Sequence, residues 1–168
     1  PVPGAAVTWE SEDWSVGDPD TEANVGEEME VGRTVRTGGR TITEADVTNF
    51  AGVSGDFNHL HTDAERMADS MFGERIAHGM FVFSAATGLI WQARSPEERA
   101  SVVAFYGIDR VRFRAPVFVG DTIHVELEVT DKAEREKGPG TGVITYDLEV
   151  VNDSGTTVLS CEMRSLMR

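Results

Sequence analysis

Residues 78–93 constrain the fold more than any other part of the chain, because they are apolar on nearly every side of a helical projection. Between Gly79 and Trp91 the only polar side chains are the small ones of Ser84 and Thr87. A helix with this pattern must be enclosed on most sides. It is shorter than the roughly 20 residues that a bilayer-spanning helix needs, so we expect the enclosing material to be protein.

The second half of the chain supplies strands that could enclose this helix. Five segments are expected to be strands: residues 102–106, 110–116, 122–130, 144–150 and 159–164. In the last three, apolar and polar residues alternate with a period of two, which predicts antiparallel strands with one buried and one solvated face. Residues 138–142 and 152–155 are rich in turn-forming residues. Because helices come early and strands late, the predicted class is α+β, with a curled antiparallel sheet wrapped around a long central helix.

The first part of the chain is predicted to contain a tail and a short strand. Residues 1–28 are acidic and show no periodicity. We interpret them as an acidic N-terminal tail that folds over the surface, with Trp9 and Trp14 in grooves. Residues 29–168 then form a single domain, which begins with a strand at residues 29–37.

Two capping patterns follow this strand. Thr43 and Thr62 each begin a Thr-x-x-acid pattern, which is typical of a capping box at the start of a helix. The first predicts a helix over residues 43–53, and the second predicts a short helix over residues 62–72. The sequence Ser-Gly-Asp at residues 54–56 ends the first of them.

The charge balance excludes several classes of partner. The 168 residues include 29 acidic and 15 basic side chains, which gives a formal net charge of −14. A surface this negative repels phosphates, so neither nucleic acid nor an anionic membrane is expected as a partner. Lys132 and Lys137 are the only lysines. Such a surface suits a salt-rich, halophilic cytoplasm, and a GC-rich genome that replaces lysine by arginine explains the same bias, so both interpretations stay open.

Several features bear on location and cofactors. The first residues show no signal-peptide pattern, and we expect a cytoplasmic protein. Cys161 is the only cysteine, which excludes an internal disulfide framework. No spacing of histidine, cysteine and carboxylate residues is typical of a metal site. We therefore expect no metal and no cofactor.

The densest group of titratable residues lies between the two predicted helices, at residues 54–63. Asp56 and His61 are five residues apart in a stretch that reads as neither a strand nor a regular helix. A loop there can bring a carboxylate and an imidazole together, and such a pair can hold a water molecule and move protons at neutral pH. The structural alternative is that Asp56 caps a turn and that Asn58 and Thr62 are ordinary turn formers.

Three sequence blocks carry a family resemblance: residues 55–63 (GDFNHLHTD), 72–80 (FGERIAHGM) and 113–121 (FRAPVFVGD). In this order and spacing they resemble the MaoC-like dehydratases and, more narrowly, the (R)-specific enoyl-CoA hydratases. The resemblance runs from about residue 39 to the end of the chain. It implies the hot-dog fold, in which a long sheet wraps a central helix, in agreement with the class predicted from the strand pattern.

The resemblance also implies an activity. Asp56 and His61 would be the catalytic pair of a hydro-lyase that adds water in syn geometry to a trans-2-enoyl-CoA, giving the (R)-3-hydroxyacyl-CoA. We assign Asp56 as the base and protonated His61 as the acid, and the reverse assignment stays open because coupled groups exchange protons. The backbone amide of Gly79 would stabilise the enolate oxygen, a role that suits the positive end of a helix dipole.

Four neighbouring residues have secondary roles in this interpretation. By resemblance, Asn58 braces the catalytic loop, and Thr87 places a hydroxyl near the reacting centre, with a satisfied core hydroxyl as the alternative. His59 stands where the family usually has proline, which leaves the loop freer in φ. His78 is interpreted as a structural residue at the start of the helix.

Coenzyme A brings several negative charges to a strongly acidic protein. Arg110, Arg112 and Arg114 alternate with apolar residues, which predicts three guanidinium groups on one face of a strand. They are the candidates for binding the CoA phosphates, because arginine binds phosphate in a bidentate manner. The alternative is a solvated, ion-paired strand edge.

Two other functions stay open, a hot-dog acyl-CoA thioesterase and a non-catalytic acyl-CoA-binding module. Within the hydratases, both a short linear substrate and a branched dicarboxylic one such as mesaconyl-CoA are compatible with the sequence. Chains of this family generally associate through paired sheets, with the site between subunits. We therefore expect at least a homodimer, and an exposed strand edge on each protomer would favour it.

Overall fold

The centre of the fold is helix α4 (Gly79–Ala93), which confirms the predicted central helix. The computed structural model describes residues 29–136 and 138–168, so the predicted tail and its two tryptophans lie outside the described residues. The core side chains of α4 are Phe81, Val82, Phe83, Ala85, Ala86, Leu89 and Ile90. Within one chain the helix is not enclosed all round, because Met80 and Trp91 remain exposed.

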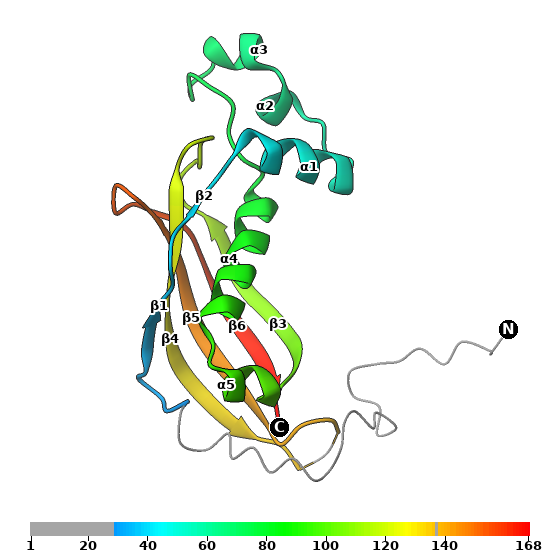
Figure 1. The fold of residues 1–168 in the computed structure, drawn as a ribbon, viewed down its shortest axis with the longest axis vertical. Helices are drawn as coiled ribbons and strands as arrows, with labels where there is room; N and C mark the ends of the chain where they lie inside the picture. The colour runs from blue at the N-terminus through cyan, green and yellow to red at the C-terminus, as the bar shows by residue number, and fades with distance from the viewer. Residues whose placement is uncertain (1–28, 137) are drawn as a thin grey trace, which may run out of the picture.

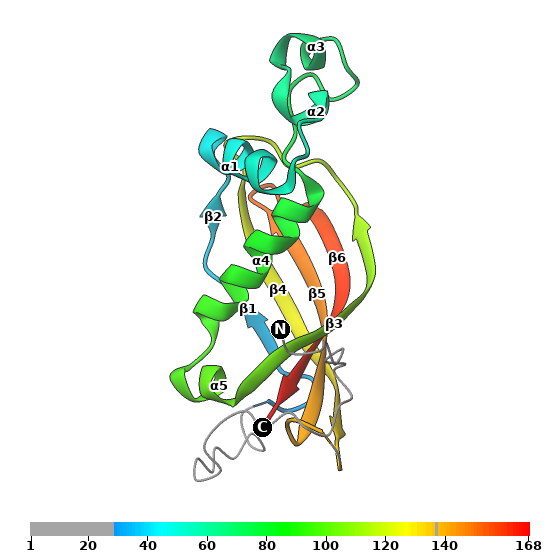
Figure 2. The same ribbon diagram turned by 90° about the vertical axis from the view of Figure 1, so that its right-hand side faces the viewer.

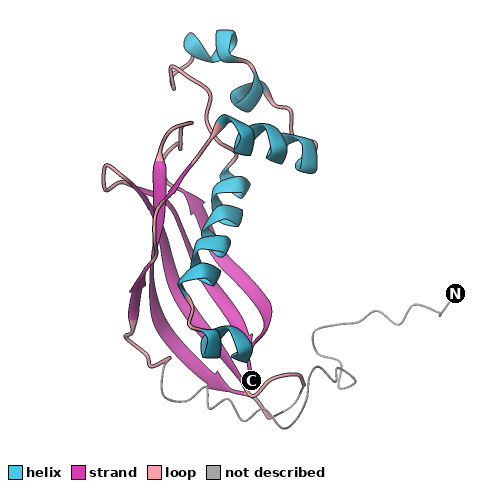
Figure 3. Ribbon diagram, in the orientation of Figure 1, coloured by secondary structure: helices cyan, strands magenta, loops and turns pink. Residues whose placement is uncertain are grey.

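One antiparallel sheet wraps around α4 (Figures 1 and 3). Its strands follow the order β1-β4-β5-β6-β3, and β2 pairs with β4. The strands are β1 (Thr34–Arg36), β2 (Arg40–Thr41), β3 (Val102–Phe113), β4 (Thr122–Glu134), β5 (Gly142–Asn152) and β6 (Thr157–Met167). This arrangement is the expected α+β class with the hot-dog fold.

The alternating pattern of the three long C-terminal strands places their apolar residues against α4. Among the most deeply buried of these side chains are Val125, Val129, Leu148, Val150 and Leu159, each at most 1% exposed. Burying each such side chain contributes about 1.5–3 kcal/mol relative to leaving it in water. The sheet and α4 therefore form one core that holds the ends of α4 in fixed positions.

Three elements near the sheet edges differ from the sequence prediction. The two short strands expected near residues 102–116 are one strand, β3, whose pairing with β6 shifts register at three places. The strand expected at residues 29–37 is confined to β1. Helix α5 (Pro96–Ser101), which the prediction lacks, begins with a capping box between Ser95 and Glu98.

Helices α1 (Glu44–Ser54), α2 (His59–Thr62) and α3 (Ala64–Ala68) lie together beyond the first turn of α4 (Figure 2). The Thr43 capping box is confirmed, with Asp46 as its acidic partner. The second helix is shorter than predicted at both ends. Asp63 rather than Thr62 caps α3, because the Thr62 hydroxyl donates to the carbonyl oxygens of Phe57 and Asn58, and α3 ends at Ala68. Among the described residues, no helix is long and apolar enough to cross a membrane.

Candidate active site

The segment between α1 and α3 brings Asp56 and His61 together. Helix α1 ends at Gly55, which adopts the left-handed conformation with φ 77°. The amide of Asn58 donates to the Asp56 carboxylate at 3.2 Å, and the Asn58 side chain accepts from the amide of Leu60. Asn58 therefore caps the one-turn helix α2 that carries His61, where the sequence predicted no regular helix. This bracing of the loop agrees with the role expected for Asn58.

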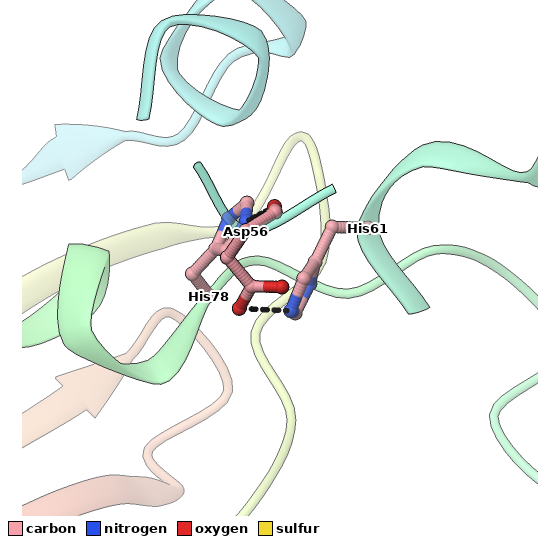
Figure 4. Close-up of side chains that lie close together, drawn as sticks. All are labelled: Asp56, His61 and His78. Atoms are coloured by element: carbon pink, nitrogen blue, oxygen red, sulfur yellow. Dashed lines mark hydrogen bonds and ion pairs between the residues drawn. The ribbon is translucent and has the colours of Figure 1, made fainter. Parts of the chain in front are cut away.

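The Asp56 carboxylate and the His61 imidazole face each other (Figure 4). Oδ2 of Asp56 lies 3.9 Å from Nε2 of His61. This distance is too long for a direct hydrogen bond and leaves room for a water molecule bonded to both atoms. The Asp56 side chain is half exposed, whereas His61 is buried. One end of the pair is therefore open to incoming molecules.

The other ring nitrogen of His61 fixes its tautomer. Nδ1 lies 2.7 Å from the carbonyl oxygen of Ile76. Since a carbonyl oxygen only accepts, Nδ1 carries the hydrogen, and in the neutral ring Nε2 presents its lone pair toward Asp56. Burial, reinforced by the nearby His78 and His59, lowers the pKa of His61, against the opposite effects of the Ile76 carbonyl and Asp56. The neutral imidazole is thus favoured at neutral pH.

His78, interpreted from the sequence as a structural residue, contacts both members of the pair. It is 3% exposed, and its Nε2 bonds the backbone oxygen of Asp56 at 2.9 Å. Its ring stacks on that of His61, with centroids 3.7 Å apart. One signal was available in the sequence: histidine is a poor N-cap, so a histidine just before a helix suggests that its side chain has another use. In the structure His78 makes no side-chain capping bond to α4.

The first turn of α4 points at the same space. The amides of this turn have no intrahelical partner, and they carry the positive end of the helix dipole. Gly79 has no side chain, and a Cβ there would lie 2.6 Å from the Phe113 ring. A side chain at this position would therefore have to displace Phe113. The position of Gly79 suits an amide that donates to a ligand oxygen.

Asp56, His61, His78 and Gly79 line one cavity of about 570 Å³. Its other walls are mostly apolar and come from α1, the loop before α4, and the segment after β3. Apolar walls with a few convergent polar groups are typical of a small-molecule site.

A family profile described as "MaoC like domain" matches residues 27–152, which is most of the chain. The chain belongs to this MaoC-like family. The match includes the loop of Asp56, the helix of His61 and all of α4.

Individual relatives of this MaoC-like chain differ in length. Protein MaoC of Klebsiella aerogenes is 43% identical over 111 residues, which are 66% of this chain and 32% of that protein. The (R)-specific enoyl-CoA hydratase of Aeromonas caviae is 34% identical over 134 residues, 80% of this chain and 92% of the relative. The X-ray structure of a monoamine oxidase regulatory protein from Archaeoglobus has a TM-score of 0.76 and 41% identity, covering 84% of this chain and 92% of that one. The chain thus spans about a third of the Klebsiella protein.

All three arginines considered for CoA binding are exposed in this MaoC-like fold, but only one of them lines the cavity. Arg110 has a positive φ of 52° and pairs with Glu162 at 2.6 Å. Arg112 is exposed and donates to a backbone oxygen. Arg114, held by the Ser160 hydroxyl, is the one that lines the cavity. Arg110 therefore belongs to an ion-paired strand edge, together with Glu162 and Asp147.

Thr87 does not line the cavity of the pair in the described chain. It lies on α4 about 12 Å along the helix from Gly79, at 1.5 Å per residue. Its hydroxyl donates to the Ser84 carbonyl oxygen at 2.8 Å. The hydroxyl thus has a hydrogen-bond partner within its own helix, as in the alternative interpretation of Thr87 from the sequence. It lines a separate, smaller pocket. The expected position near the reacting centre is therefore not found within one chain.

Asp56, His61 and His78 place one potential metal ligand each within 4.8 Å of one another. Their orientation does not suit a metal ion. The two imidazole rings are stacked with an interplanar angle of 26°, so their in-plane lone pairs run nearly parallel instead of converging. The cluster is better suited to proton transfer than to metal coordination.

Proposed function

We propose that this MaoC-like protein is a hydro-lyase that reversibly adds water to a trans-2-enoyl-CoA and forms the (R)-3-hydroxyacyl-CoA. The observation that carries the proposal is the 3.9 Å separation of Asp56 Oδ2 and His61 Nε2 beside the first turn of α4. The hydratase and dehydratase names of the relatives support the same class of reaction.

The state of His61 favours a particular proton path. Neutral His61 accepts a proton from the water through Nε2 as the water oxygen attacks the β-carbon. Asp56 accepts a hydrogen bond from the same water and stabilises the imidazolium that forms. His61 then returns a proton to the α-carbon on the same face, so that the addition is syn and no proton is gained or lost. This path favours the reverse of the assignment made from sequence, with His61 as the base.

The electrons of the double bond move to the thioester oxygen during the attack. That oxygen would lie at the first turn of α4, where the Gly79 amide donates a hydrogen bond to the developing enolate. A preorganised donor of this kind typically contributes about 100- to 1,000-fold in rate. The pantetheine arm and the phosphates of the bound substrate would extend out of the open side of the cavity, past Arg114. Arg114 is thus the one of the three candidate CoA-binding arginines that remains in the proposal.

We also propose that two chains form the functional unit. β3 pairs with β6 on one side only, and among the described strands none covers its other edge. Exposed apolar side chains lie on this edge and on the open strip of α4: Met80, Trp91, Phe105 and Phe113. A second copy pairing through β3 would cover both surfaces. Light scattering after gel filtration should give the mass of a dimer.

The test is hydration of crotonyl-CoA, followed by loss of the enoyl-thioester absorbance at low and at molar salt. The product is assayed with (R)- and (S)-specific dehydrogenases, and only the (R) product is expected. Asp56→Ala and His61→Ala should lower kcat about 100- to 10,000-fold. His124→Gln and Asp153→Asn, distant residues of the same types, serve as controls.

The alternatives give different results in the same assay. Release of free thiol would indicate a thioesterase. Binding of acyl-CoA that is unchanged in Asp56→Ala, without turnover at either salt concentration, would indicate a binding module. Either result would overturn the proposal.

A further inference from the structure

A second pocket, of about 210 Å³, lies at the other end of α4. Its polar lining groups are Thr87, Arg94 and Ser165, and the rest of its lining is apolar, from α4, β3 and β6. The pocket lies at the start of β3, whereas the cavity of Asp56 and His61 lies at the end of β3. The proposed mechanism uses none of the residues that line this pocket.

Arg94 is the unusual residue of this distal pocket. It is only 9% exposed. Its Nη2 donates to the hydroxyls of Tyr146 and Ser165 at 3.4 and 3.3 Å, which are long distances to neutral oxygens. Among residues 29–136 and 138–168, no carboxylate forms an ion pair with Arg94. A buried guanidinium is normally held by an anion, because burying an unpaired charge is costly.

The nearest buried acid cannot serve this purpose. Glu98 lines a small void together with Arg94 and Tyr146. Its carboxylate already pairs with Arg33 at 2.6 Å and accepts from the amide of Ser95 at 2.8 Å. The Arg94 side of the distal pocket is therefore left with hydrogen-bond donors and a positive charge, beneath apolar walls.

We propose that the distal pocket binds a carboxylate at the far end of the acyl chain, with Arg94 as its receptor. This inference rests on the proposed function and assigns its substrate class: enoyl thioesters whose acyl chain ends in a carboxylate. The guanidinium binds carboxylates in a bidentate manner, and the apolar walls suit the methylene groups that precede the carboxylate. A chain that ends in a methyl group would leave Arg94 buried without an anion.

The proposed dimer gives the acyl chain a route from the cavity of Asp56 and His61 to the distal pocket. β3 starts at Val102 beside the distal pocket and ends at Phe113 beside the cavity of the pair. If two copies of β3 pair antiparallel about an axis near their middle, the start of one strand lies opposite the end of the other. The distal pocket of one subunit then adjoins the Asp56–His61 cavity of its partner, and one acyl chain can reach both.

The experiment uses trans-2-enoyl-CoAs of increasing chain length, each as a matched pair that ends in a methyl group or in a carboxylate. At the length that fits, the wild type should prefer the carboxylate member by about 10- to 100-fold in kcat/KM, the usual value of a hydrogen-bonded charge. Arg94→Met keeps most of the side-chain volume and should abolish this preference, so that the ratio of kcat/KM between the two members falls to about one. Arg94→Lys should retain part of the preference, and Arg66→Met, an exposed arginine on α3, should retain all of it.

A binding assay separates this inference from the proposed function. Calorimetry measures binding of free aliphatic dicarboxylates and of the corresponding monoalcohols, with thermal unfolding to show that each variant is folded. Carboxylate binding that Arg94→Met abolishes supports the site even if no thioester is hydrated. Hydration without any preference for the carboxylate member, at every length, overturns the inference and leaves the hydratase proposal standing. Absence of both carboxylate binding and preference also overturns it.

Discussion

The imidazole rings of His61 and His78 are stacked with their centroids 3.7 Å apart and their planes inclined by 26°. At this distance His78 is one of the causes that lower the pKa of His61, after burial. His78 also holds the backbone oxygen of Asp56 through Nε2. One buried residue therefore influences both the position of the carboxylate and the charge of the imidazole.

Substitution of His78 should separate these two effects. His78→Phe keeps a stacked ring but loses the bond to Asp56, and kcat/KM should fall about 10-fold, the usual net value of a lost hydrogen bond to a buried acceptor. His78→Gln can keep that bond and should retain most of the activity. In both variants the acid limb of the pH–rate profile should move to higher pH, because His78 lowers the pKa of His61. Equal losses in the two variants, with unmoved profiles, would leave His78 with a packing role only.

The pH dependence of activity follows from the state of His61. Burial is the largest cause that lowers its pKa below the ordinary 6.5. Because the neutral ring is the base, kcat/KM for hydration should be level above pH 6.5 and fall as the pH drops through the lowered pKa. An acid limb centred above 6.5 would contradict this assignment.

The same shift of the His61 pKa makes stability depend on pH. Between the lowered pKa and 6.5 the unfolded chain binds more protons at this residue than the folded chain. The contribution of His61 to the free energy of unfolding is therefore fully present above pH 6.5 and is lost as the pH falls through this window. Urea unfolding of the wild type and of His61→Gln over the same pH range should show the difference, with His124→Gln as the matched control.

The close approach of Gly79 and Phe113 predicts a rescue. Gly79→Ala places a Cβ where the Phe113 ring lies, and the displaced ring should obstruct the cavity and lower kcat/KM about 10-fold or more. Phe113→Ala in the same chain removes the obstruction and should restore part of the activity. A double-mutant cycle measures this coupling, and strictly additive effects would show that the two residues act independently.

His59 is a site where the loop can be made more rigid. It is the first residue of α2, where proline is favoured, and Asn58 before it has φ −55° and ψ 142°, which a following proline tolerates. His59→Pro should raise the free energy of unfolding by about 0.5–1 kcal/mol by restricting the unfolded chain. Thermal unfolding measures the gain, and His59→Ala, which lacks the ring constraint, should show none. A destabilised proline variant would mean that the native backbone at His59 is not helical.

Like charges face each other on the outer side of the sheet. Glu126 lies opposite Glu149, and Glu128 lies opposite Asp147, on the paired strands β4 and β5. Such pairs are destabilising by a few tenths of a kcal/mol each, and salt screens them because all four side chains are exposed. The Tm should therefore rise with potassium chloride, and Glu149→Gln should raise the Tm at low salt and flatten its salt dependence. Glu65→Gln on α3 is the control. If the Tm of both variants depends equally on salt, the salt effect does not come from the like-charge pairs of β4 and β5.

The sequence predicted the parts of the fold in which burial repeats at a regular interval. The alternation around Val125, Leu148 and Leu159 located three strands, because one face of each is packed on α4. β3 was divided into two because its register shifts and the positive φ of Arg110 interrupt the alternation. Helix α5 was not predicted because it has no apolar stripe, although its capping box was present in the sequence.

The candidate site was predictable where its residues are neighbours in the sequence. Asp56 and His61 belong to one motif, and α2 and its cap bring them together over a few residues. The positions of His78 and Arg94 depend on contacts with residues far away in the chain, such as Tyr146 and Ser165 for Arg94. A local pattern carries no information on such partners. The same reason explains why Thr87 lies away from the place that the sequence suggested.

The separation of Asp56 and His61 from the sheet has an evolutionary consequence. Asp56 lies in the loop between α1 and α2 and His61 lies on α2, beyond the end of the sheet, whereas Gly79 begins the core helix α4 (Figure 1). Insertions, deletions and substitutions between residues 55 and 77 can change the reaction without disturbing the packed core. Substitutions in the second half of α4 and the first half of β3, away from Gly79 and Phe113, can change the acyl group without disturbing the reaction. Selection can therefore act on chemistry and on substrate range as two nearly independent traits of one small domain.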